Sequence, residues 1–95
     1  MAGYLIARVT VTDPEKYQDY TVVTPGLIAK YGGRLLVRGG ETVTLEGPEE
    51  TGRVVVVEFD SLERAMAMYR SDEYQAAIKL RAGAATAQFI AVAGV

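Results

Sequence analysis

The stretch KYGGRLLVRGG, residues 30–40, places Arg38 at the end of a short apolar segment, directly before a pair of glycines. A second arginine, Arg8, interrupts the apolar segment YLIARVTV near the start of the chain. The guanidinium group is a planar fork of hydrogen-bond donors that binds a carboxylate or a phosphate through two bonds. Arg8 and Arg38 are therefore candidates for binding a small organic anion, and Gln88 is a neutral side chain that could join them.

Two further polar residues complete the set of candidate ligand-binding residues. Tyr74, in the segment YRSDEYQ, could turn its hydroxyl group toward the mouth of a pocket. Glu58 suits the role of partner to an arginine better than that of a general base. For the arginines themselves, pairing with surface acids such as Glu41 is the simpler alternative. No catalytic residue can be identified from these patterns.

The composition excludes several classes of site. The chain has 95 residues and a net charge of -2, which predicts a single domain over residues 1–95 and no partner among the nucleic acids. It contains no cysteine and no histidine, which removes thiolate nucleophiles, zinc–sulfur sites and imidazole-bound iron or haem. We therefore expect no cofactor and no metal. The opening MAGYLIARVTVTD lacks the features of a signal peptide, and no apolar run is long enough for a membrane span, so we predict a cytoplasmic protein without membrane contact.

The elements that must position these residues follow from the periodicity of apolar side chains. Turn signals and helix caps separate them, and Pro25 predicts a kink or break near Val23 in the first helix. The expected elements are a strand over 4–11, a helix from Pro14 to Gly32, a strand over 33–40, a polar arm over 41–52, a strand over 52–59, a helix capped by Asp60 that carries Leu62, Ala65, Met66 and Tyr69, a short helix from Ser71 to about Ala82, and a strand over 86–93.

The order strand, helix, strand, strand, helix, strand is typical of the ferredoxin-like α+β fold, in which both helices cover one face of an antiparallel sheet. Tyr17 and Tyr20 recur at helical spacing, which is more typical of the core than of catalysis. The segments TDPEKYQDY, KYGGRLLVRGG and RVVVVEFDSLERAMAMYRSDEYQAAIKLR, with the final AQFIAVAGV, resemble the family called domain of unknown function 1330 (DUF1330). This resemblance implies a dimeric α+β barrel, a fold whose other members include small monooxygenases, a muconolactone isomerase and stress-response proteins.

Strand alternation predicts which face of the sheet needs a partner. One face carries Leu5, Ala7, Val9, Val57 and Phe59 and should lie under the helices. The opposite face still carries seven apolar residues, more than a monomer usually exposes. These residues are Tyr4, Ile6, Leu36, Val54, Val56, Ile90 and Val92. We therefore predict a homodimer in which this second face, the barrel face, packs against a second copy.

The same alternation places Arg8, Arg38 and Gln88 together at one end of the barrel face, with Glu58 at the other end. The two arginines would stand roughly 10 Å apart at the backbone. At that separation they repel each other by about 1.7 kcal/mol at an effective dielectric constant of about 20, which a bound anion would offset. We therefore expect a small anionic organic ligand between the sheet and the helices. The alternatives are a dimer whose barrel is filled by side chains and binds no ligand, and a cofactor-free oxygenase or isomerase.

Overall fold

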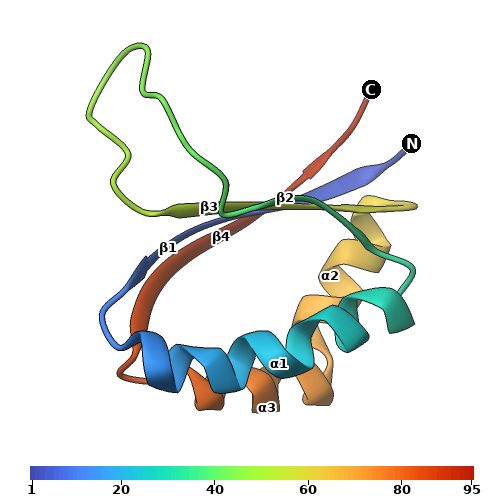
Figure 1. Cartoon of the computed structure of the whole chain (residues 1–95). Coiled ribbons are helices and arrows are strands. Elements are labelled where there is room, and N and C mark those ends of the chain that lie inside the picture. The colour runs from blue at the N-terminus through green and yellow to red at the C-terminus, as the bar shows by residue number, and fades with distance from the viewer.

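A computed structural model describes residues 1–95 as a four-stranded antiparallel sheet with all helices on one face (Figure 1). The strands lie in the order β2-β3-β1-β4, which confirms the predicted ferredoxin-like fold. The elements are β1 (Gly3–Val11), α1 (Pro14–Lys30), β2 (Arg34–Arg38), β3 (Arg53–Phe59), α2 (Leu62–Arg70), α3 (Asp72–Leu80) and β4 (Ala85–Ala93). No helix is both long and apolar enough to cross a membrane.

Side-chain caps fix where the helices begin. The Asp13 side chain accepts a hydrogen bond from a backbone N–H in the first turn of α1. Ser61 caps α2, so the cap lies one residue after the predicted Asp60. Ser71 caps α3, and its hydroxyl oxygen accepts a hydrogen bond of 3.1 Å from the backbone N–H of Tyr74. Each cap satisfies a backbone donor that has no partner within the helix, and the last one also anchors Tyr74 in the first turn of α3.

The first helix runs unbroken through Pro25, so the expected break near Val23 does not occur. Thr24 and Ile28 are buried on either side of the proline, and their packing holds the turns in place although the proline donates no backbone hydrogen bond. Gly32 follows the helix with a φ of 78°, a left-handed conformation that favours glycine, as predicted.

A β-bulge in β2 changes which side chains share a face. Leu35 lies opposite Val57, but Val37 lies opposite Val56, so one extra residue is inserted between them. The alternation is reversed beyond this point, and Arg38 lies opposite Val55 on the helix-covered face. The prediction that Arg38 shares the barrel face with Arg8 is therefore wrong, because strict alternation fails at a bulge.

The hydrophobic core lies between the sheet and the helices. Tyr17 and Tyr20 of α1 are only 7% and 6% exposed, which confirms that they are core residues. They pack with apolar residues from every layer of the fold. The remaining buried members of this core are Leu5, Ala7, Val9, Ile28, Val57, Phe59, Ala65, Met68, Tyr74, Ala77 and Ala84.

The opposite face of the sheet is not covered by any element of the chain (Figure 1). Leu36, Ile90 and Val92 are 53%, 50% and 45% exposed there. The irregular segment 39–52 connects β2 to β3 and includes the predicted polar arm over 41–52. This whole segment, the arm, rises on the same side of the sheet (Figure 1). Its side chains Val43 and Leu45 are also largely exposed. The chain thus displays an extended apolar surface, as the alternation pattern predicted.

Candidate functional site

A cavity of about 330 Å³ lies between the helix-covered face of the sheet and the helices. All four strands and all three helices contribute to its wall. Most of the lining side chains are apolar and belong to the core, including Leu35, Val55, Met68 and Phe89. A cavity with such a wall favours the body of an apolar organic molecule.

Two arginines stand at the β2–β3 side of this cavity. Arg38 comes from the end of β2 and Arg53 from the start of β3, and both line the cavity. Arg53 lies opposite Val9, a core residue, and its guanidinium group lies against Gly39 so closely that a methyl group there would come within 2.8 Å of Nη1. The two arginines are therefore neighbours across the strands, one at each base of the arm.

Neither of these arginines is neutralised by the protein. The chain forms three ion pairs, which join Arg8 to Glu50, Lys30 to Glu73 and Arg34 to Glu58, and neither Arg38 nor Arg53 takes part. The Nε of Arg53 is also buried without a hydrogen-bond partner. Two uncompensated positive charges thus lie beside an apolar cavity, an arrangement that attracts anions.

The other hydrogen-bonding side chains of the wall are Thr21, Thr24 and three tyrosines, namely Tyr17, Tyr20 and Tyr74. The hydroxyl groups of Tyr20 and Tyr74 are hydrogen-bonded to each other, and their rings meet edge to face with centroids 6.2 Å apart. Burial raises the pKa of Tyr74 well above its ordinary value, and the neighbouring Tyr20 adds to this effect. Burial likewise raises the pKa of Tyr17. The hydroxyl groups of Tyr17 and Tyr74 therefore stay neutral at physiological pH.

A further arginine, Arg81, packs against this tyrosine cluster without lining the cavity. The guanidinium carbon of Arg81 lies 5.1 Å from the centroids of both the Tyr20 and the Phe89 rings. A cation over an aromatic face is attracted by the ring's quadrupole, and this attraction strengthens away from water. Arg81 directly follows α3, where its charge also complements the negative end of the helix dipole.

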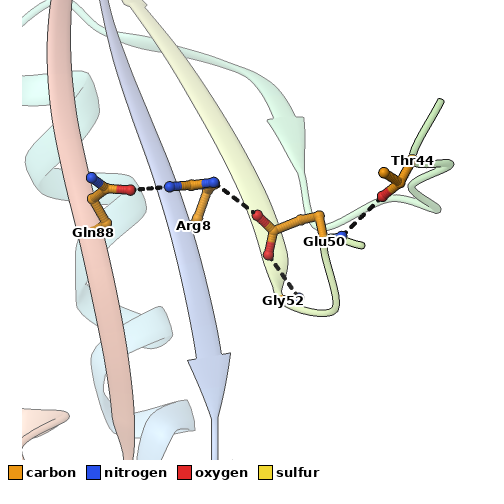
Figure 2. A network of polar contacts seen from close by, with 5 residues as sticks. All are labelled: Arg8, Thr44, Glu50, Gly52 and Gln88. Atoms are coloured by element: carbon orange, nitrogen blue, oxygen red, sulfur yellow. Dashed lines mark hydrogen bonds and ion pairs between the residues drawn. The ribbon is translucent and has the colours of Figure 1, made fainter. Parts of the chain in front are cut away.

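Arg8 and Gln88 lie on the open face of the sheet, away from the cavity. Arg8 donates hydrogen bonds to Gln88 and, at 3.2 Å, to Oε1 of Glu50 (Figure 2). Glu50 also accepts from the backbone N–H of Gly52 and donates its own backbone N–H to Thr44, so this carboxylate ties the arm to the sheet (Figure 2). The predicted proximity of Arg8 and Gln88 is confirmed. Arg8 also pairs with a surface acid, as the simpler alternative expected, although that acid is Glu50 and not Glu41.

Glu58 lies on the open face at the other end of the sheet, as predicted. It forms an ion pair with Arg34 and accepts a hydrogen bond of 3.2 Å from the Tyr4 hydroxyl group. These contacts give Glu58 a structural partner on each side. The carboxylate does not line the cavity.

Of the five predicted ligand-binding residues, Arg38 and Tyr74 line the cavity, whereas Arg8, Glu58 and Gln88 do not. Arg53 was missed, although the sequence held a signal for it. The regular alternation of β3 places Arg53 on the same face as Val55 and Val57, directly under the helices.

The sequence matches the family model described as domain of unknown function (DUF1330) over residues 2–95. The chain belongs to the DUF1330 family. No curated protein matches it.

Solved structures share the fold of this DUF1330 protein. A protein of unknown function from Rhodopseudomonas palustris is 22% identical with a TM-score of 0.74, and the match covers 99% of this chain and 82% of that one. SnoaB, a cofactor-independent oxygenase from Streptomyces nogalater, is 12% identical with a TM-score of 0.70 over 99% and 93% of the two chains. A dimeric ferredoxin-like protein of unknown function from Thermobifida fusca is 15% identical with a TM-score of 0.58 over 99% and 92%. At these identities the likeness shows the fold alone.

Proposed function

We propose that this DUF1330 protein binds a small, largely apolar organic anion in the cavity between the sheet and the helices. The observation that carries the proposal is the pairing of an apolar cavity of about 330 Å³ with two arginines that have no protein acid as partner. The volume lies within the range of about 300–1,000 Å³ typical of small-molecule sites. The apolar wall takes the body of the ligand, and Arg38 and Arg53 take its charged group.

The charge balance supports an anion in particular. Arg38 and Arg53 are diagonal neighbours on adjacent strands, so their side chains begin about 7–8 Å apart. Without a ligand, the two positive charges repel each other across this distance. A carboxylate between them would remove the repulsion and give the Nε of Arg53 a hydrogen-bond acceptor.

The proposal includes a homodimer in which a second copy covers the open face of the sheet. Apolar residues on this face, such as Ile90 and Val92, are about half exposed in the single chain. The arm rises on the same side of the sheet (Figure 1), and its exposed residues Val43 and Leu45 are available to contact a second copy. Burying apolar area contributes about 25 cal/mol per Å², which favours association. The Thermobifida fusca protein of the same fold is described as dimeric.

Titration calorimetry with 2-naphthoate tests the binding site. The wild-type protein should bind this two-ring carboxylate, and Arg38→Gln should weaken binding by about tenfold or more, because it removes a charge-assisted hydrogen bond. Arg8→Gln is the matched control, since it makes the same change of charge on the opposite face of the sheet. The proposal is wrong if 2-naphthoate does not bind, or if Arg8→Gln weakens binding as much as Arg38→Gln does.

Cofactor-free oxygenation is a second candidate, since SnoaB is a cofactor-independent oxygenase with the same fold. The buried hydroxyl pair of Tyr20 and Tyr74 beside an apolar cavity would suit a substrate that must be shielded from water. The cavity wall, however, contains no carboxylate or imidazole group that could act as a general base. Binding without chemistry is therefore the better-supported function, and oxygen consumption in the presence of a bound hydroxyaryl acid would reverse this order.

A further inference from the structure

The hydroxyl pair of Tyr20 and Tyr74 leaves one proton without an acceptor. Each tyrosine hydroxyl group carries a single proton, and the bond between the two groups uses one of the two protons. Neither hydroxyl group has any other hydrogen-bond partner in the structure. The two side chains are only 6% and 2% exposed, and both line the cavity. A buried donor without an acceptor is costly, and the remaining proton is available to a bound molecule.

The chemistry of this donor restricts the group that it can bind. Burial raises the pKa of Tyr74 and keeps its hydroxyl group neutral, although the nearby Arg81 acts in the opposite direction. A neutral hydroxyl group in an apolar cavity suits a neutral acceptor such as a carbonyl or hydroxyl oxygen. A carboxylate is better held by Arg38 and Arg53, which line the cavity, whereas Arg81 does not.

The strand order separates the two polar groups of the cavity. Arg38 belongs to β2, at one edge of the sheet, and the Tyr74 ring lies 6.4 Å from the ring of Phe89 in β4, at the other edge. Three strand spacings separate these edges, or about 14 Å at the backbone. A ligand that reaches both groups must be elongated and apolar between its two polar ends.

Resting on the proposed function, we propose that Tyr20 and Tyr74 bind a carbonyl or hydroxyl oxygen at the end of the ligand remote from its carboxylate. The ligand class is then an elongated hydroxy- or oxo-substituted carboxylic acid with an aromatic or other apolar body. The arginines select the charge, and the tyrosine pair selects the second oxygen. An acid without that oxygen leaves the spare tyrosine proton unpaired and binds more weakly.

The test compares two acids that differ by one hydroxyl group, 2-naphthoate and 6-hydroxy-2-naphthoate, by titration calorimetry. The wild-type protein should bind the hydroxy acid about tenfold more tightly, the value of one additional buried hydrogen bond. The double variant Tyr20→Phe/Tyr74→Phe should remove this preference and leave the affinity for 2-naphthoate within about twofold. Either single variant would still leave one tyrosine proton without a protein acceptor. Tyr69→Phe is the matched control, because the Tyr69 ring lies 5.2 Å from that of Tyr74 but does not line the cavity.

Each outcome separates this inference from the proposed function. Equal binding of the two acids by the wild-type protein, with binding still lost in Arg38→Gln, overturns the role of the tyrosine pair and leaves the anion site intact. Equal weakening of both acids by the double variant also overturns it, because the two tyrosines would then act only through the fold. If thermal unfolding shows that the double variant is not folded, the comparison of the two acids in the wild-type protein and in Tyr69→Phe decides, and equal affinities in both overturn the role of the tyrosine pair. Failure of both acids to bind overturns the proposed function, and this inference with it.

Discussion

Removal of one cavity arginine should stabilise the ligand-free protein, which is unusual for a residue that is partly packed. Arg38 and Arg53 are diagonal cross-strand neighbours, and neither has an acidic partner. At a separation of about 8 Å and an effective dielectric constant of about 20, two positive charges repel each other by about 2 kcal/mol. Arg38 is exposed, so salt at about 0.15 M reduces this value to about 0.7 kcal/mol, whereas at about 0.01 M it stays near 1.5 kcal/mol.

We therefore expect Arg38→Gln to raise the free energy of unfolding by about 0.5 kcal/mol near physiological salt and by about 1 kcal/mol at low salt, after a small loss of packing by the arginine stem. Arg34→Gln is the matched control on the same strand. It makes the same change of charge but breaks the ion pair with Glu58, so it should lower the free energy of unfolding by about 0.2–1 kcal/mol.

Urea denaturation at two salt concentrations and one fixed protein concentration measures both variants. The two arginines of β2 should give effects of opposite sign, and the stabilisation by Arg38→Gln should shrink as salt is added. If Arg38→Gln destabilises the protein as much as Arg34→Gln does, or if its effect is independent of salt, the two cavity arginines do not repel each other. The electrostatic argument for a bound anion would then fail.

Four other changes test the dimer, the core, the tyrosine site and the fold. Val54→Asp should place a charge in the proposed sheet-to-sheet interface and yield monomers in analytical ultracentrifugation, and a variant that keeps the wild-type mass would contradict the dimer. Tyr20→Ala should lower the free energy of unfolding by about 3–5 kcal/mol in urea, and a loss under about 1 kcal/mol would show that this ring is not core. Because burial raises the pKa of Tyr74 above 10.0, unfolding releases its proton above that pH, so stability should fall as pH rises beyond 10.0 and should fall less steeply in Tyr74→Phe. Gly3→Ala should sharply lower the melting temperature, since the added methyl group would come within 2.5 Å of the Ser61 backbone.

The sequence alone was enough to predict the elements and the fold, because these depend on local chemistry. Gly32 and Ser71 mark helix ends through their own conformational and capping preferences, and the period of apolar residues separates strands from helices. The alternation in β1, β3 and β4 also predicted correctly which face lies under the helices and which face is left uncovered. It further predicted that Arg8 and Gln88 are neighbours.

The composition of the candidate site was decided by tertiary structure. The sequence GRLLVRGG is compatible with either a regular strand or a bulged one. Only the pairing of β2 with β3 places the extra residue before Val37 and turns Arg38 toward the helices. The arginine that lies beside Arg38 at the cavity is consequently Arg53, at the other end of the arm, and not Arg8. The meeting of Tyr20 with Tyr74 depends on the packing of α1 against α3, which are distant in sequence. A register shift and a helix–helix contact both arise from non-local interactions, which local sequence patterns do not specify.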